Sequence, residues 1–153
     1  MATRADINTK VWDRIVARFA AIGTRRVGVG VFGDEEQADI ARHHEYGARI
    51  MRAGVQVGTL PERSYIRSTL REKSADIDRT MKRVAIGWSN GKLTIERGLG
   101  LLGLFAANAV KAKIRSNIPP PLAASTIARK GSSKALVDTG RLINSITWKI
   151  VDD

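Results

Sequence analysis

Two long stretches of helical patterning, separated by a short break, constrain this chain more than any other feature. In the first, apolar side chains recur three, four or seven residues apart, at Ile66, Leu70, Ile77, Met81, Val84 and Trp88. Charged side chains occupy the opposite face, where Asp78 and Lys82 are spaced as a favourable helical pair. Ser89-Asn90-Gly91 then breaks the pattern. We therefore expect one long amphipathic helix over residues 63–88.

Local sequence signals also mark the start of this helix and predict a second helix after it. Thr59 and Glu62 have the spacing of a capping box, and Pro61 between them is tolerated in a first helical turn. A second helix is expected over residues 92–116. Its middle, residues 99–107, is apolar nearly all round, which predicts burial in the centre of the fold or of an assembly.

Shorter elements precede these helices. We expect a helix capped by Asn8 or Thr9 and ended by Gly23, with its apolar face at Trp12, Ile15, Val16, Phe19 and Ile22. A strand is predicted over residues 27–32, where valines alternate. A helix over 34–46, with acids in its first turn, should end at Gly47. Residues 48–60 indicate a loop or hairpin that turns at Ala53-Gly54.

After the second long helix, Pro119, Pro120 and Pro121 end regular structure and open a long connection over residues 117–135. Residues 125–130 are expected to form one helical turn within it. Asp138 or Thr139 is predicted to cap a short helix, and residues 146–151 alternate as a closing strand.

These elements predict an α+β fold in a single domain over residues 1–153, with extended arms at about 47–60 and 117–135. The valine strand, the closing strand and the arm around Val55 should form a small antiparallel sheet. The two long helices should cover one face of it, and helical residues should clearly outnumber strand residues.

Composition narrows the class of protein. The 153 residues include no cysteine, which excludes a disulfide framework and a thiolate metal site. No signal segment is expected at the start, and the longest apolar run, residues 98–107, is too short for a membrane span. We therefore expect a soluble protein.

The net charge of +11 is unusual, and no acid lies between Arg97 and Val137. The basic residues of this stretch are Arg97, Lys111, Lys113, Arg115, Arg129, Lys130 and Lys134. They indicate an anionic neighbour, either nucleic acid or an acidic protein face, or simply a solvated surface. Aromatic residues make up only 5% of the chain and none interleaves with these cations, which argues against a stacking platform for single strands.

Two glycine patterns match the dinucleotide-binding spacing, one at Gly28, Gly30 and Gly33 and one at Gly98, Gly100 and Gly103. The first lies within the predicted strand and is followed by acids, and the second lacks the later ribose-binding acid. Glycines that allow close packing explain both, so no cofactor is expected.

The remaining candidates for chemistry are equally weak. His43 and His44 are adjacent, so on a helix they point about 100° apart and do not converge on one metal. A structural pair is expected instead, beside Glu45. Ser125 and Ser145 lack the glycine elbow of a hydrolase nucleophile. The sequence therefore predicts no enzyme, no catalytic residue, no metal site and no small-molecule substrate.

Three segments together resemble a known family. They are His44-Glu45-Tyr46-Gly47, then Leu60-Pro61-Glu62-Arg63-Ser64-Tyr65-Ile66-Arg67, and finally Pro120-Pro121-Leu122, Thr126-Ile127-Ala128-Arg129-Lys130-Gly131, Leu136-Val137-Asp138-Thr139-Gly140-Arg141-Leu142 and Ser145-Ile146. In wording, order and spacing they resemble the tail-completion, or head–tail joining, proteins of tailed bacteriophages. The resemblance covers about residues 27–151 and is most specific in the third segment. Ser64 departs from the pattern, where a proline is common.

The resemblance implies a virion protein of the neck or tail junction, assembled in the host cytoplasm, without catalysis or cofactor. It implies a homo-oligomeric ring, with a hexamer expected, around the DNA passage. Its partners would be the head-completion or connector protein and the tail-tube or tail-terminator protein. DNA would pass through the ring without sequence-specific binding, and no membrane would be involved.

The residues expected to dock against neighbouring chains lie in the third segment. They are Pro119, Pro120, Pro121, Arg129, Lys130, Lys134, Asp138, Thr139, Gly140 and Arg141. Our hypothesis is that the prolines form a stiff spacer that carries the turn at residues 129–131 towards a neighbour. The alternative is that this loop only wraps its own domain.

The basic residues Lys111, Lys113 and Arg115 would face DNA or an acidic partner ring. An alternative function is a basic nucleic-acid-binding protein that acts outside the particle.

Overall fold

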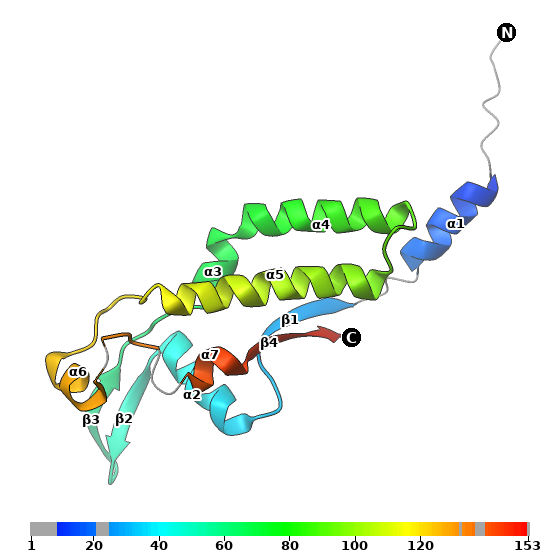
Figure 1. The fold of residues 1–153 in the computed structure, drawn as a ribbon. Coiled ribbons are helices and arrows are strands. Elements are labelled where there is room, and N and C mark those ends of the chain that lie inside the picture. The colour runs from blue at the N-terminus through cyan, green and yellow to red at the C-terminus, as the bar shows by residue number, and fades with distance from the viewer. Residues whose placement is uncertain (1–8, 21–24, 132, 137–139, 153) are drawn as a thin grey trace.

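The computed structural model describes residues 9–20, 25–131, 133–136 and 140–152 (Figure 1). Over these residues it contains seven helices and two antiparallel sheets of two strands each. The chain is 55% helical and 18% strand, so the predicted α+β class and the excess of helix are confirmed. In chain order the elements are α1 (Thr9–Ala20), β1 (Arg26–Val31), α2 (Glu35–Tyr46), β2 (Ala48–Arg52), β3 (Val55–Leu60), α3 (Arg67–Glu72), α4 (Ser74–Ser89), α5 (Ile95–Arg115), α6 (Ala124–Lys130), α7 (Arg141–Ser145) and β4 (Ile146–Val151).

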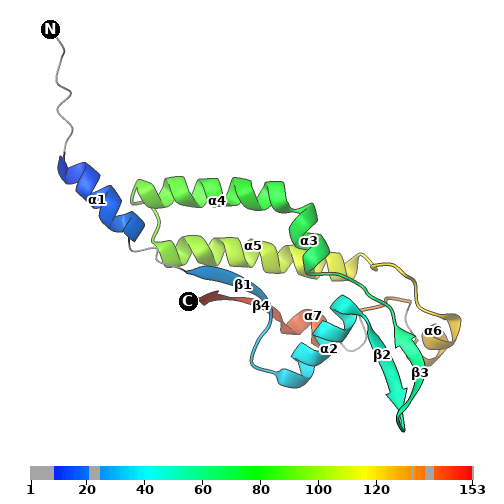
Figure 2. The ribbon, with the colours of Figure 1, turned by 180° about the vertical axis from the view of Figure 1, so that it is seen from behind.

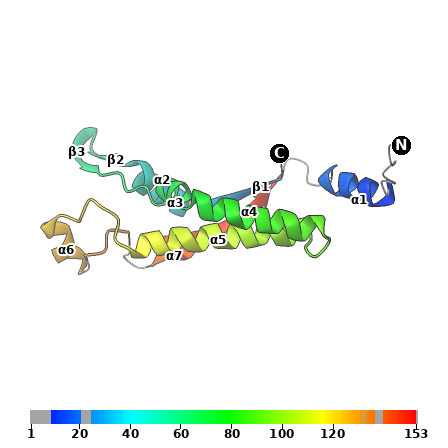
Figure 3. The same ribbon diagram turned by 90° about the horizontal axis from the view of Figure 1, so that it is seen from above.

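Helix α5 lies at the centre of the layered body. The β1–β4 sheet packs on one side of it, and α4 runs beside it on another (Figures 1 and 2). Of the two long helices, α5 therefore covers the sheet directly, and α4 stacks against α5. Seen from above, α1 lies at one end of the molecule, while α6 and the β2–β3 hairpin lie at the other (Figure 3).

Strands β1 and β4 pair as predicted from their alternation. Val29 lies opposite Trp148, and Val31 lies opposite Ile146. Because side chains alternate across a strand, these four residues share one face of the sheet. The Trp148 ring on this face lies against α5, where a Cβ added at Gly103 would come within 2.5 Å of the ring. The glycine is therefore needed for the close approach of helix and sheet.

Strands β2 and β3 form a hairpin of their own, so the prediction that the arm around Val55 joins the main sheet was wrong. The two-residue turn at Ala53 and Gly54 has positive φ at both positions, 48° and 80°. Such a turn matches the twist of two adjacent strands and pairs them with each other. Strand β3 therefore pairs with β2, from Ala48 opposite Leu60 to Arg52 opposite Val55.

The helix predicted over residues 63–88 is two helices and begins later. Residues 61–66 are not helical, and the capping box is not formed, because Thr59 is part of β3. The helical course bends at Lys73, between α3 and α4. The apolar stripe has a gap there, since Lys73 and Ser74 stand where packing residues would continue it. Helix α3 is tied instead to the far end of α5, where Lys113 Nζ lies 2.7 Å from a carboxylate oxygen of Glu72.

Helix α5 begins at Ile95, three residues later than predicted, because the Thr94 hydroxyl caps it by accepting a bond from Arg97 N–H at 3.3 Å. Its middle is not buried on all sides within the chain. Leu101 and Leu104 are 46% and 51% exposed. Burial within the domain therefore explains only part of the apolar segment.

The shorter predicted helices agree with the structure. Asp34 caps α2, its carboxylate accepting the Gln37 N–H at 3.0 Å, and Gly47 ends it with φ of 75°. The predicted turn at 125–130 is α6. Helix α7 has Gly140 at its N-cap position and no side-chain cap, while Asp138 and Thr139 lie outside the described residues. Asn8 and Gly23, predicted to bound the first helix, and Ile22, predicted on its apolar face, also lie outside them.

The main core gathers where α2, α5, α7 and β4 meet. Its most buried members are Tyr65, Val110, Ile114 and Ile146. None of the helices in the described ranges is long and apolar enough to cross a membrane.

We predict that Gly103→Ala lowers the free energy of unfolding by about 1–2 kcal/mol, measured by urea denaturation. Alanine would favour the helix by about 1 kcal/mol, but its methyl group would collide with Trp148. The matched control is Gly30→Ala, where an added Cβ has nothing within 4 Å and stability should barely change. A Gly103→Ala chain as stable as the wild type would contradict the close packing of α5 on the sheet.

Candidate interaction site

The first two motif segments are joined by one carboxylate. The end of α2 places Glu45 beneath the turn that leads into α3, where its side chain is 5% exposed. Its oxygens accept backbone N–H bonds from Tyr65, Ile66 and Arg67 at 2.7, 2.9 and 2.9 Å. They also accept the Ser64 hydroxyl at 2.8 Å. Glu45 thus caps α3 from another element, in place of a local N-cap side chain.

The electrostatics of Glu45 follow from this geometry. Burial by itself would raise the pKa of the carboxyl, but the hydrogen bonds from Ile66, Arg67, Ser64 and Tyr65 outweigh it and hold the pKa below the usual 4.5. Burial also raises the pKa of the Tyr65 hydroxyl, and the Glu45 charge raises it further. That hydroxyl donates to the Ala41 carbonyl at 3.1 Å, which ties α2 to the same turn.

Arg67 closes the network on its solvent side. Its guanidinium donates to Glu45 Oε1 at 3.1 Å and to Glu62 Oε1 at 2.7 Å, and it lies 4.3 Å from the centre of the Tyr46 ring. The carboxylate of Glu45 is therefore surrounded by donors rather than held ready for proton transfer.

The third motif segment is joined to the second by Arg63. This residue is 3% exposed, and its Nε and Nη2 donate to the Pro120 carbonyl at 3.1 and 2.8 Å. Burial lowers the pKa of its guanidinium. The far end of the loop is held as well, since Ala135 N–H donates to the Asn117 side chain at 3.0 Å. Both ends of the predicted docking loop are thus attached to their own domain.

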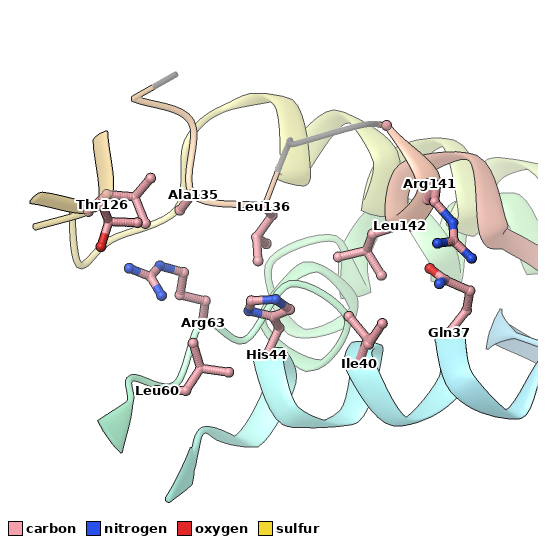
Figure 4. Close-up of a pocket in the computed structure, with 12 residues that line it drawn as sticks. Gln37, Ile40, His44, Leu60, Arg63, Thr126, Ala135, Leu136, Arg141 and Leu142 are labelled. Carbon is pink, nitrogen blue, oxygen red and sulfur yellow. The ribbon is translucent and has the colours of Figure 1, made fainter. Parts of the chain in front are cut away.

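A pocket of about 410 Å³ lies where these segments meet (Figure 4). Arg63 stands at one end and Arg141 with Gln37 at the other, and the loop residues Ala135 and Leu136 lie across from His44. Its polar lining consists of cationic and uncharged side chains, and none of the described lining residues has a carboxylate. The described lining residues are Gln37, Ile40, His44, Leu60, Arg63, Leu122, Thr126, Ala135, Leu136, Gly140, Arg141 and Leu142. Within the described residues, no group of three or more His, Asp or Glu could hold a metal ion.

Three of the predicted docking residues contact their own domain, Pro120 through its carbonyl and Gly140 and Arg141 along the pocket. Pro120 and Arg141 are nevertheless exposed, as are Pro119, Pro121 and Lys134. The backbone of Arg129 and Lys130 ends α6, which Gly131 terminates with φ of 69°. Asp138 and Thr139 fall in the undescribed segment.

The three basic residues predicted to face DNA do not share one face of α5. Lys111 and Arg115 are four residues apart and lie on one side, whereas Lys113 points elsewhere and pairs with Glu72. Arg97, Leu101, Leu104, Lys111 and Arg115 fall on the outward face of α5 by helical spacing. This face is basic and partly apolar.

The hairpin carries the largest exposed apolar surface among the predicted arms. Ile50, Met51, Val55 and Val57 are 48%, 56%, 65% and 58% exposed. Sequence analysis assigned these residues to a predicted arm at 47–60 but did not identify their exposed apolar surface, and it did not identify Glu45, Arg63 and Arg67 as a network. The motif segments contained all three network residues, but nothing in their spacing showed that one carboxylate would accept hydrogen bonds from five donor groups.

No family model, curated protein or solved structure matches this chain.

We predict that Glu45→Gln destabilises the chain by about 3 kcal/mol at neutral pH, because an amide cannot accept all of the buried donors. The folded-state pKa of Glu45 is depressed, so its contribution is present above the unfolded value of 4.5 and is lost as pH falls through the folded pKa. The stability difference between wild type and variant, measured by urea denaturation, should therefore shrink below pH 4.5. A difference independent of pH would show that the charge of Glu45 is not what matters.

Proposed function

We propose that this chain is a structural virion protein of the neck or tail junction of a tailed bacteriophage, acting in tail completion or head–tail joining. It works through surface contacts and without catalysis, as a homo-oligomeric ring, with a hexamer favoured, around the DNA passage. The head-completion or connector protein and the tail-tube or tail-terminator protein are its neighbours. It is located in the virion after assembly in the host cytoplasm.

The observation that carries the proposal is the exposed hairpin. Two strands alone are at best marginally stable in water, and these two present four large apolar side chains to solvent. The register places Val55 and Val57 on one face of the hairpin and Ile50 and Met51 on the other, so both faces are apolar and open to solvent. Exposed apolar surface on a soluble protein commonly marks an interaction site. The hairpin is therefore best explained as an arm that becomes buried on assembly.

The arrangement of the motif segments supports the same proposal. Glu45 and Arg63 bind the three segments into one framework, and the framework leaves the hairpin and α6 at the same end of the molecule (Figures 1 and 3). Residues that resemble the family thus fix the base of both arms. This division between a fixed base and projecting arms suits a subunit that must bind neighbours on more than one side.

The proposal predicts that antibody against the chain labels the head–tail junction of purified particles in electron micrographs. Removal of its coding sequence from the producing strain should leave heads and tails unjoined, and the wild-type gene supplied in trans should restore joining. Complete, infectious particles that lack the polypeptide would refute the proposal.

A second candidate, a nucleic-acid-binding protein acting outside the particle, is favoured only by the basic outward face of α5. Under the lead proposal DNA binding should be weak, independent of sequence and steeply dependent on salt. Replacing both Lys111 and Arg115 with alanine should reduce the log–log salt slope by about 2, in fluorescence anisotropy with duplex DNA. Lys113→Ala is the matched control, since Lys113 is paired with Glu72 and should change the slope little. Tight binding to one sequence would favour the second candidate.

A further inference from the structure

The hairpin arm is apolar and basic, and this chemistry restricts what it can dock against. Besides its four exposed apolar side chains, it carries Arg49 and Arg52, and no acid lies between Gly47 and Leu60. Both arginines are exposed. A partner must therefore offer an apolar seat with negative charge at its edge.

One surface of the chain itself meets this description. A groove of about 210 Å³ runs beside α2, with Val31, Ala38 and Ile66 among its lining residues and Tyr46 at one end. Glu35 lies one turn before Ala38 on the same face of α2, and Glu36 follows it. Arg42 and Arg67 also line the groove, but each is paired with an acid, Arg42 with Asp39 and Arg67 with Glu45 and Glu62. The groove therefore combines apolar side chains with neutralised ion pairs, and the unpaired charges beside it are those of Glu35 and Glu36.

Glu35 and Glu36 are available to a partner, whereas most of the other acids in the described ranges are already paired. Glu62, Glu72, Asp76 and Glu96 each form an ion pair with a lysine or arginine. Glu35 and Glu36 are exposed and form no ion pair with any residue in the described ranges. They also belong to the one run of three consecutive acids in the sequence, residues 34–36.

The arm leaves the domain at the C-terminal end of α2, whereas Glu35 and Glu36 lie at its N-terminal end (Figures 1 and 2). The two ends of this 12-residue helix are about 18 Å apart. We propose that the hairpin arm docks into the α2 groove of a second copy of this chain, with Arg49 and Arg52 beside Glu35 and Glu36. Arm and groove are different surfaces, so the contact repeats head to tail and generates a ring when the rotation closes.

This inference rests on the proposed ring and identifies the surfaces that build it. The register puts Arg49 and Arg52 on the same face of the hairpin as Val55 and Val57. A phosphate backbone would pair with the two arginines but would leave Val55 and Val57 without an apolar partner. A second copy satisfies both. DNA as the occupant of the arm is therefore an alternative that the experiment must separate.

The test uses the full chain and sedimentation velocity over a range of concentrations. The wild type should self-associate. The arm variant R49E/R52E and the groove variant E35R/E36R should each associate about tenfold or more weakly, because like charges then face one another. The control R71E/R83E makes the same charge change as the arm variant on α3 and α4, where both arginines are exposed, and should associate like the wild type.

Mixing supplies the decisive measurement. In an equimolar mixture of the two variants, the acidic arm of the arm variant meets the basic groove rim of the groove variant. The next contact in the ring joins the unchanged arm of the groove variant to the unchanged groove of the arm variant. Association should return to near the wild-type strength, although each variant alone fails. Circular dichroism at neutral pH checks that each variant is folded, since Glu35 and Glu36 also favour the start of α2.

A separate variant tests the apolar part of the contact. V55S/V57S keeps every charge, so it should weaken self-association without changing the salt dependence of DNA binding. Three outcomes would overturn the inference. The wild type could stay monomeric, the mixture of arm and groove variants could stay dissociated, or the arm variants could change DNA affinity alone and leave self-association unchanged. Particles that contain the chain at the junction while arm and groove variants still form rings would overturn this inference alone and leave the proposed function standing.

Discussion

The buried carboxylate of Glu45 is the constraint on which the rest of the arrangement depends. A charge this deep is tolerated only because three backbone N–H groups and a hydroxyl point at it, and those donors in turn have no other acceptor. The bond set fixes where α3 begins and holds Tyr65 in the core. Since α3 leads into α4, and α4 packs along α5, the entry angle of the helical layer is decided at the end of α2.

The same junction explains why this domain has a rigid base and exposed arms. Arg63, which precedes the Glu45 donors Tyr65 and Ile66 by two and three residues, donates two hydrogen bonds to the Pro120 carbonyl and so holds the proline segment. Asn117 holds the other end of the loop at Ala135. The hypothesis that this loop wraps its own domain therefore holds for its two ends. Docking of α6 against a neighbouring chain stays a prediction.

Where the sequence signals and the fold disagree, a different contact has taken the place of the expected one. Thr59 and Glu62 had the spacing of a helix start, but Thr59 is committed to β3, and Glu45 caps the helix later in the chain. The alternation around Val55 indicated a strand of the main sheet, yet the turn at Ala53 and Gly54 paired it with β2. Likewise Lys113 was grouped with Lys111 by sequence, while Glu72 holds it on another side of α5.

The sequence by itself determined the α+β class, the position of most helices and strands, the end of α2 at Gly47, and the packing role of the glycines near Trp148. These follow from periodicity and backbone freedom, which act between residues close in the chain. Only the tertiary structure decided that the motif segments meet at Glu45 and Arg63, that the long helix is divided at Lys73, and that the hairpin stands apart. The meeting of the motif segments depends on hydrogen bonds between residues 20 and 57 positions apart, from Tyr65 to Glu45 and from Arg63 to Pro120. Spacing along the chain does not specify which distant donors a buried carboxylate or guanidinium will find.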